Sequence, residues 1–150
     1  MSRSDLLSFP NPVNEKAARA VAGGVVLLAV AALVTESAWV ALAMAVGFAL
    51  RVASGPRFSP LGRLAVHVVA PRLGAAVLVP GPPKRFAQAI GLTFTVSATI
   101  AGFAGATTLF TALLAVLLVF ATLESVAGFC AGCWVFGHLM RLGVIPEETC

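Results

Sequence analysis

The sequence predicts an all-α fold, an integral membrane bundle of four transmembrane helices with a short interfacial amphipathic helix between helices two and three. Of the 150 residues, 59% are hydrophobic and only 11% are charged, whereas soluble domains carry about 25% charged residues. The mean hydropathy is +0.99. A soluble fold could not cover its surface with so few charges. The length suits one transmembrane domain over residues 1–150.

The net charge of +4 does not indicate a nucleic-acid-binding protein. Most basic residues fall in one connection, and the chain has no basic runs interleaved with aromatics. Membrane orientation and lipid headgroups explain such a distribution better. Three cysteines, an odd number, do not form the framework of a disulfide-rich domain. We therefore expect the lipid bilayer as partner and no nucleic acid.

The first predicted span covers about residues 17–35, a continuous apolar run of roughly 27 Å as a helix. Asn14 is expected to cap its N-terminus, with Glu15 in the first turn. The preceding residues have mixed charge and two prolines, and no cleavage site follows. We interpret this segment as an uncleaved helix rather than a secretory signal.

The second predicted span covers about residues 38–53 and follows the polar turn at residues 35–37. Trp39 is placed at the headgroup level, where indole rings are favoured. The segment is short for a span, so either the helix continues or the bilayer thins there. Arg51 near its end can extend toward the surface.

The connection over residues 53–85 contains five basic residues and no Asp or Glu. Ser59 and Pro60 resemble an N-cap followed by a proline at the first helical position. The segment 60–70 then places Arg63 and His67 on one face, which predicts an interfacial helix. A helix packed under the bundle is the alternative.

The third and fourth predicted spans cover about residues 86–104 and 107–128. Small and hydroxyl residues on the third allow close approach to the fourth. An unbroken helix from residue 107 to 142 would be roughly 54 Å long, too long for one simple span. We therefore expect a kink or break between Gly128 and Gly132.

The charges predict the orientation. Counting Arg51 near the end of the second span with the connection that follows it, six of the ten Lys and Arg residues lie on this side, and the other two turns have none. The positive-inside rule places that connection in the cytoplasm. With four spans, both termini are then cytoplasmic.

Cys130 and Cys133 form a CxxC pair, which at a spacing of three would share one face of a helix. This spacing suits a reversible disulfide, in which one thiolate attacks a disulfide made by the other. It also suits two ligands of a soft metal, or two small residues that pack well. At the cytoplasmic end of the fourth span, the resting state should be the dithiol.

Glu124 is the single acidic residue within a predicted span, about two turns before Cys130. Because a membrane-embedded carboxylate is costly, it should face a partner or a cavity. We predict a polar pocket of Glu124, Arg51 and Gln88, with an Arg51–Glu124 ion pair. The pair could be purely structural, or Glu124 could transfer protons near the thiols.

A metal site formed by the two cysteines with His67 and His138 is disfavoured, because His138 is rotated away from Cys133 on a straight helix. The sequence contains no Walker loop, dinucleotide fingerprint, HExxH or catalytic triad. No metal and no cofactor are therefore expected, and no enzymatic reaction is specified.

Three motifs resemble a family of small bacterial membrane proteins catalogued as domain of unknown function 4395: NPVNEK, PKRFAQAIG and, above all, LESVAGFCAGC, which ends at Cys133. The likeness covers about residues 10–142. It implies a bacterial plasma (inner) membrane protein with Glu124, Cys130 and Cys133 at family-like positions. Similar proteins are often fused to, or encoded beside, rhodanese-like or thioredoxin-like domains, which implies sulfur or thiol-redox work with a separate partner here.

Three functions are therefore open. The first is cytoplasmic thiol redox or sulfur transfer, with Cys130 and Cys133 as the exchanging, catalytic pair. The second is a transporter or channel subunit for a small sulfur-containing anion, indicated by the basic connection and requiring a homodimer to build a pathway. The third is a non-catalytic membrane scaffold.

Overall fold

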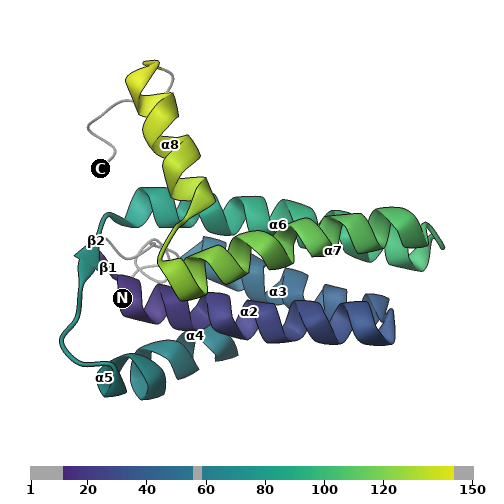
Figure 1. Ribbon diagram of the computed structural model, residues 1–150, viewed down its shortest axis with the longest axis horizontal. Coiled ribbons are helices and arrows are strands. Elements are labelled where there is room, and N and C mark those ends of the chain that lie inside the picture. Colours follow the sequence, from purple (N-terminus) through teal and green to yellow (C-terminus); the bar gives the residue numbers. More distant parts are fainter. Residues whose placement is uncertain (1–11, 56–58, 144–150) are drawn as a thin grey trace.

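The computed structural model describes residues 12–55 and 59–143, and this part of the chain is almost entirely helical. Four long helices lie side by side (Figure 1) and form the body of the molecule. These are α2 (Glu15–Thr35), α3 (Ala38–Ser54), α6 (Gly81–Phe103) and α7 (Thr107–Thr122). The all-α class is confirmed.

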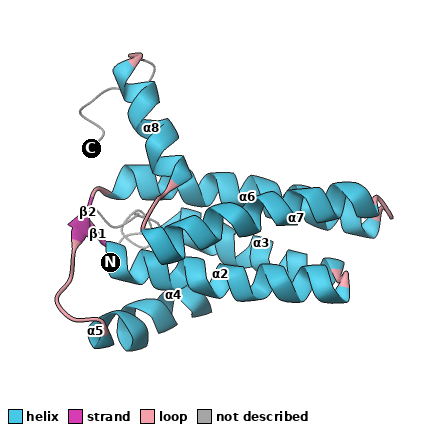
Figure 2. Cartoon of the chain, viewed as in Figure 1, coloured by secondary structure: helices cyan, strands magenta, loops and turns pink. Residues whose placement is uncertain are grey.

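Short elements gather at one end of the bundle. After α3 come α4 (Pro60–Leu64), a π-helical turn (Ala65–Val69) and α5 (Ala70–Arg72). Two-residue strands, β1 (Val13–Asn14) and β2 (Leu78–Val79), pair antiparallel beside the start of α2 (Figure 2). A second π-helical turn (Leu123–Ala127) extends α7, and α8 (Ala131–Arg141) then leaves the bundle at a steep angle (Figure 1).

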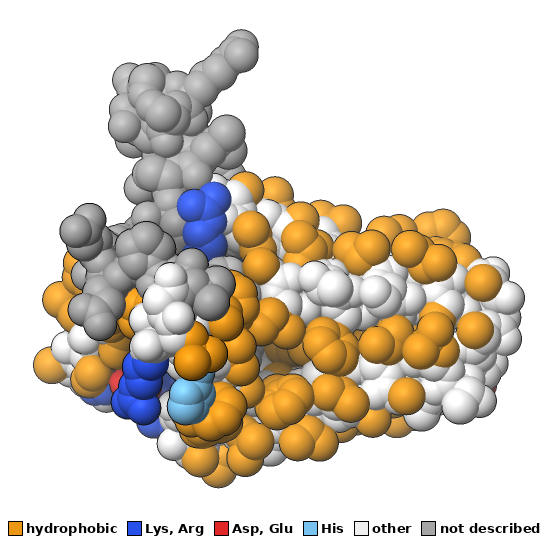
Figure 3. Space-filling view, turned by 90° about the horizontal axis from the view of Figure 1, so that it is seen from above, with side chains coloured by type: hydrophobic (Ala, Val, Ile, Leu, Met, Phe, Trp, Pro, Cys, Tyr) orange, Lys and Arg blue, Asp and Glu red, His pale blue; other side chains and the backbone are white. Residues whose placement is uncertain are grey.

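Three helices are long and apolar enough to cross a membrane: Glu15–Thr35, Gly81–Phe103 and Thr107–Ala127. Large apolar side chains on their outer faces are exposed, as expected where lipid rather than water surrounds them. Hydrophobic side chains cover most of one face away from its charged end (Figure 3). The chain is a membrane protein by these criteria. Helix α3, with 17 residues, is shorter.

The predicted helix boundaries agree closely with those of the structure, with one correction. The spans predicted at 17–35, 38–53 and 107–128 correspond to helices within two residues of those limits, if the π-helical turn that extends α7 to Ala127 is counted with it. The span predicted at 86–104 instead begins at Gly81. Pro82 and Pro83 lie in the first turn of this helix. A proline is tolerated there because the backbone N–H that it lacks would have no partner within the helix.

Local capping follows the predicted chemistry. The side chain of Asn14 accepts a hydrogen bond from the backbone N–H of Lys16 at 3.0 Å. Ser59 Oγ accepts the N–H of Gly62 at 3.2 Å and thereby caps α4. The helix predicted at 60–70 is thus present, and Leu61 packs it against α2 at Gly24. Its location at a membrane interface stays a prediction.

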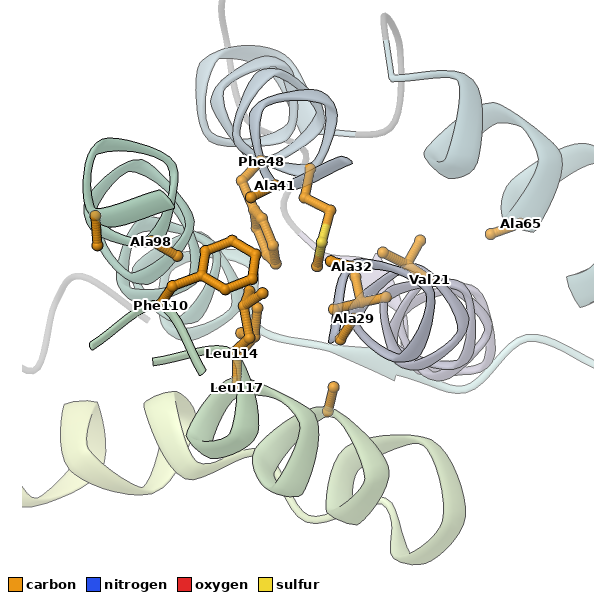
Figure 4. Packing of buried hydrophobic residues seen from close by; sticks show 14 of the residues in the cluster. Val21, Ala29, Ala32, Ala41, Phe48, Ala65, Ala98, Phe110, Leu114 and Leu117 are labelled. Atoms are coloured by element: carbon orange, nitrogen blue, oxygen red, sulfur yellow. The ribbon is translucent and has the colours of Figure 1, made fainter. Parts of the chain in front are cut away.

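Small residues hold the four helices close together. Most core positions on α2 and several on α3 and α6 are alanines, such as Ala29, Ala41 and Ala98, all fully buried. Larger side chains of α3 and α7, including Phe48 and Leu114, fill the space between them (Figure 4). Because apolar attraction between helices is weak in lipid, close packing of this kind is the main source of bundle stability.

Gly91 of α6 lies directly against the ring of Phe48, so an added methyl group would overlap the ring. Gly137 of α8 has open space at the same position. Both alanine substitutions gain about 1 kcal/mol of helix propensity, but Gly91→Ala also overpacks the core at a cost of about 1–3 kcal/mol. We expect Gly91→Ala to be less stable than Gly137→Ala by about that cost in thermal or denaturant unfolding in detergent. Equal stabilities would contradict the α3–α6 packing.

Candidate functional site

The expected break after α7 is present and is built from backbone hydrogen bonds. Gly128 has a φ of 72°, and its N–H donates to Glu124 O at 3.1 Å. This left-handed conformation favours glycine and ends the helix. The guanidinium of Arg19 donates to Ser125 O and Val126 O at 3.2 and 2.8 Å. These bonds satisfy carbonyls that the end of a helix leaves without partners.

The break changes the expected arrangement of the CxxC pair. Cys130 was expected on a helical face shared with Cys133, but it is the N-cap of α8 with extended backbone angles. Its Sγ accepts the backbone N–H of Cys133 at 3.2 Å. Because Gly128 ends the preceding helix, Cys130 begins a new one. A sulfur at a helix N-terminus is favoured as a thiolate by the helix dipole.

The two thiols are unequal. The hydrogen bond from the Cys133 thiol lowers the pKa of Cys130, and the nearby Lys84 ammonium acts in the same direction. Burial and the Glu124 carboxylate oppose the shift but do not cancel it. The pKa of Cys133 is raised, first because its thiol donates to Cys130 and second because it is buried. Cys130 is therefore the more acidic thiol of the pair.

Helix α8 is held on α6 by close contact. A Cβ at Gly132 would lie 2.6 Å from Cα of Ala87, so the two backbones approach as nearly as glycine allows. Beside this contact the rings of Phe86 and Phe136 pack with centroids 5.7 Å apart. The start of α8, and Cys130 with it, is thereby fixed against α6.

Glu124 pairs with Lys84, not with Arg51 as predicted. Lys84 Nζ lies 3.0 Å from Glu124 Oε1, and the side chains are 9% and 16% exposed. Arg51 instead donates to Gln88 Oε1 and Ser59 Oγ, both at 2.9 Å. The early start of α6 explains the correction, because it brings Lys84 into the first turn beside the end of α7. Arg51 and Gln88 do meet, but Glu124 is not their partner.

Lys84 is the site residue that sequence reasoning missed. A usable signal was present, since Lys84 and Gln88 are four apart and share a helical face. That face becomes apparent only once the prolines at 82 and 83 are accepted as the first turn of a helix.

A cavity of about 250 Å³ adjoins Cys130. Apolar side chains of α2, α6 and α7 form most of its wall, while Cys130, Glu124 and Gln88 contribute the few polar groups. Such a wall, mostly apolar with convergent polar groups, is typical of small-molecule sites. The sulfur of Cys130 therefore borders a mostly apolar space within the bundle.

The histidines do not join the thiols. Within residues 12–55 and 59–143, no group of three or more His, Cys, Asp and Glu residues is placed to hold a metal ion. The ring of His138 instead packs edge-on against Trp134, with centroids 4.1 Å apart.

The family model described as Domain of unknown function (DUF4395) matches residues 13–141. This match covers most of the chain, so the protein belongs to that family, as the sequence motifs indicated. No curated protein and no solved structure matches the chain significantly.

The Lys84–Glu124 pair predicts a specific energetic coupling. Lys84→Gln or Glu124→Gln alone leaves a mostly buried charge without its partner, which costs about 3–5 kcal/mol. The double variant should recover much of this loss, since no charge is then stranded. Unfolding of the four proteins in detergent measures the coupling. Arg51→Gln combined with Glu124→Gln is the control and should be nearly additive; strong coupling there would instead support the rejected Arg51–Glu124 pair.

The lowered pKa of Cys130 predicts its reactivity. In a Cys150→Ser background, alkylation of Cys130 should persist below the pH at which an ordinary thiol becomes unreactive, because the thiolate is the attacking form. Cys133→Ala removes the thiol donor and should move the inflection of the rate–pH curve upward. Alkylation is quenched after set times, and mass spectrometry identifies the labelled cysteine. This gives the rate–pH curve of Cys130 with and without the Cys133 thiol. An unchanged inflection would mean that Cys133 does not influence the Cys130 thiolate.

Proposed function

For this member of the DUF4395 family, we propose a role as a membrane partner in cytoplasmic thiol redox or sulfur transfer, with Cys130 and Cys133 as the exchanging pair. The observation that carries the proposal is the position of Cys130. It caps α8 with its sulfur on the N–H of Cys133, 3.2 Å away. This arrangement provides one stabilised thiolate and a second thiol adjacent to it.

The exchange follows from the inequality of the two thiols. The Cys130 thiolate attacks one sulfur of a partner disulfide, forms a mixed disulfide and displaces the other sulfur as a thiolate. Cys133 then loses its proton and attacks Cys130 Sγ, which closes the internal disulfide and releases the partner's second thiolate. The partner gains two electrons and this protein loses two. Reversal of both steps would reduce the internal disulfide of this protein and oxidise the partner. In sulfur transfer, the Cys130 thiolate would attack the outer sulfur of a partner persulfide, which forms a persulfide on Cys130 and releases the partner's thiolate; attack by Cys133 on Cys130 Sγ would then release hydrosulfide and close the internal disulfide.

The proposed partner is a separate rhodanese-like or thioredoxin-like protein. Both cysteines are only half-buried, so a protein thiol can approach from the side of α8. The Glu124 carboxylate, held by Lys84, lies at the same cavity as Cys130. A carboxylate at this position can accept the proton that Cys133 releases.

We also propose that α2, α3, α6 and α7 are four spans of a bacterial inner membrane protein with both termini in the cytoplasm. The four helices are of similar length and lie alongside one another (Figure 1). Every Lys and Arg among the described residues belongs to the end that carries α8, whereas Glu36 is the charged residue described at the opposite turn. The positive-inside rule favours that basic end as cytoplasmic.

Trapping separates the roles of the two cysteines. Cys133→Ser should accumulate a mixed disulfide through Cys130, because the resolving thiol is missing, whereas Cys130→Ser should accumulate none. The variants are made in a Cys150→Ser background and expressed in cells, and adducts are resolved on non-reducing gels.

A membrane-impermeant maleimide should label the pair in inverted vesicles but not in intact cells.

Three outcomes would contradict the proposal. Equal adducts from both variants would remove the distinction between attacking and resolving thiols. Labelling from outside the cell would reverse the orientation. Full function of the Cys130→Ser, Cys133→Ser double variant under sulfur stress would favour a non-catalytic scaffold.

A further inference from the structure

Arg51 carries a buried positive charge that no described carboxylate balances. It lies near the end of α3 and is 5% exposed. Its hydrogen bonds go to Gln88 and Ser59, and its guanidinium lies 4.6 Å from the centroid of the Phe48 ring. All three partners are neutral. Among the described residues, the single ion pair joins Lys84 to Glu124 instead.

This arrangement has an unbalanced charge. Lys84 and Glu124 neutralise each other, so the group formed with Arg51 has a net charge of +1 inside the bundle. Burying an ionised group without a counter-charge costs several kcal/mol, and neutral hydrogen bonds offset only part of that. An arginine cannot relieve the cost by losing its proton, because its intrinsic pKa is too high. A bound anion would balance the charge.

Space for an anion is present beside the guanidinium. A cavity of about 240 Å³ is lined by both buried cations, Arg51 from α3 and Lys84 from α6. Asn14 and Gln88 add amide groups, and Val21 and Val66 contribute apolar wall. This volume is below the roughly 300 Å³ at which pockets for drug-sized ligands begin, so it suits a small ligand or one group of a larger ligand.

We propose that this cavity binds a tetrahedral oxyanion of the phosphate or sulfate type, with Arg51 as the principal ligand and the ammonium of Lys84, already paired with Glu124, as a second hydrogen-bond donor. Nε and Nη1 of Arg51 already donate to Gln88 and Ser59, so the remaining N–H groups of the guanidinium, including those of Nη2, are the donors available to the oxygens of such an anion. The anion is either a free ion or the phosphate of a lipid headgroup. The site goes beyond the proposed thiol exchange and requires neither cysteine. Gln88 lines both this cavity and the cavity at Cys130.

The test measures anion binding by the purified full chain in a nonionic detergent and a low-salt buffer without phosphate or sulfate. Phosphate and sulfate are titrated separately, by calorimetry and by the rise in Tm. The wild type should show a saturable response. Arg51→Met should weaken binding at least tenfold and, without anion, should unfold at the same or a higher temperature than the wild type, because it removes an unbalanced buried charge.

Two controls make the result specific. Arg72→Gln removes an exposed cation and should leave the response unchanged. The Cys130→Ser, Cys133→Ser double variant should bind anion like the wild type, so failure of thiol exchange and failure of anion binding are distinguishable. If Arg51→Met does not fold, Arg51→Lys replaces it, since it keeps the charge but loses the guanidinium donors and should weaken binding several-fold.

Phosphorus analysis of the purified protein separates the two sources. About one phospholipid per chain in the wild type, lost in the Arg51 variant, identifies a headgroup. Saturable binding without retained phospholipid identifies a free ion. The proposal is overturned if the wild type neither retains phospholipid nor binds either anion, or if the Arg51 variant matches the wild type in both measurements.

Discussion

The ion pair between Lys84 and Glu124 joins the first turn of α6 to the wide turn that ends α7. Separating the pair would leave each charge in an apolar bundle without its partner, which is costly, so the pair favours keeping the two helix ends together. That junction fixes the end of α7 against α6, Arg19 of α2 holds the break that follows, and the break in turn places Cys130 at the start of α8. The thiol geometry thus depends on an electrostatic contact made by residues outside the CxxC motif.

Close packing between helices stabilises the bundle in addition to the ion pair. Alanine and glycine positions let α3 and α8 approach α6, at Gly91 in the core and at Gly132 beside the thiols. The contact at Gly132 leaves α8 little freedom to slide, because the opposing atoms belong to backbone as well as side chain. A bundle with little apolar driving force in lipid relies on such contacts, and here the same contacts determine where the reactive sulfur lies.

The fold was largely predictable from the sequence, whereas the sequence predicted most residues of the site but not Lys84 and not which charged residues pair. Long apolar runs, the Asn14 cap and the overlong fourth segment follow from local rules, so helix boundaries and the break emerged correctly. The start of α6 did not, since proline at 82 and 83 fits either a loop or a first helical turn. Lys84 was missed for that reason, and Glu124 was given the wrong partner. Which buried cation meets which carboxylate depends on helix rotation, which hydropathy does not encode.

The π-helical turn at Leu123–Ala127 has a consequence for how this chain can vary. A wide turn accommodates one residue more than an α-helix of the same rise. Since each residue of an α-helix advances by about 100°, one residue added to a regular helix would rotate everything that follows. The wide turn absorbs that residue locally, so the chain beyond it keeps the direction that a regular helix one residue shorter would give. Chains of this family that lack one residue at this turn should therefore have a regular helical turn there and keep their cysteines at the same side of the bundle.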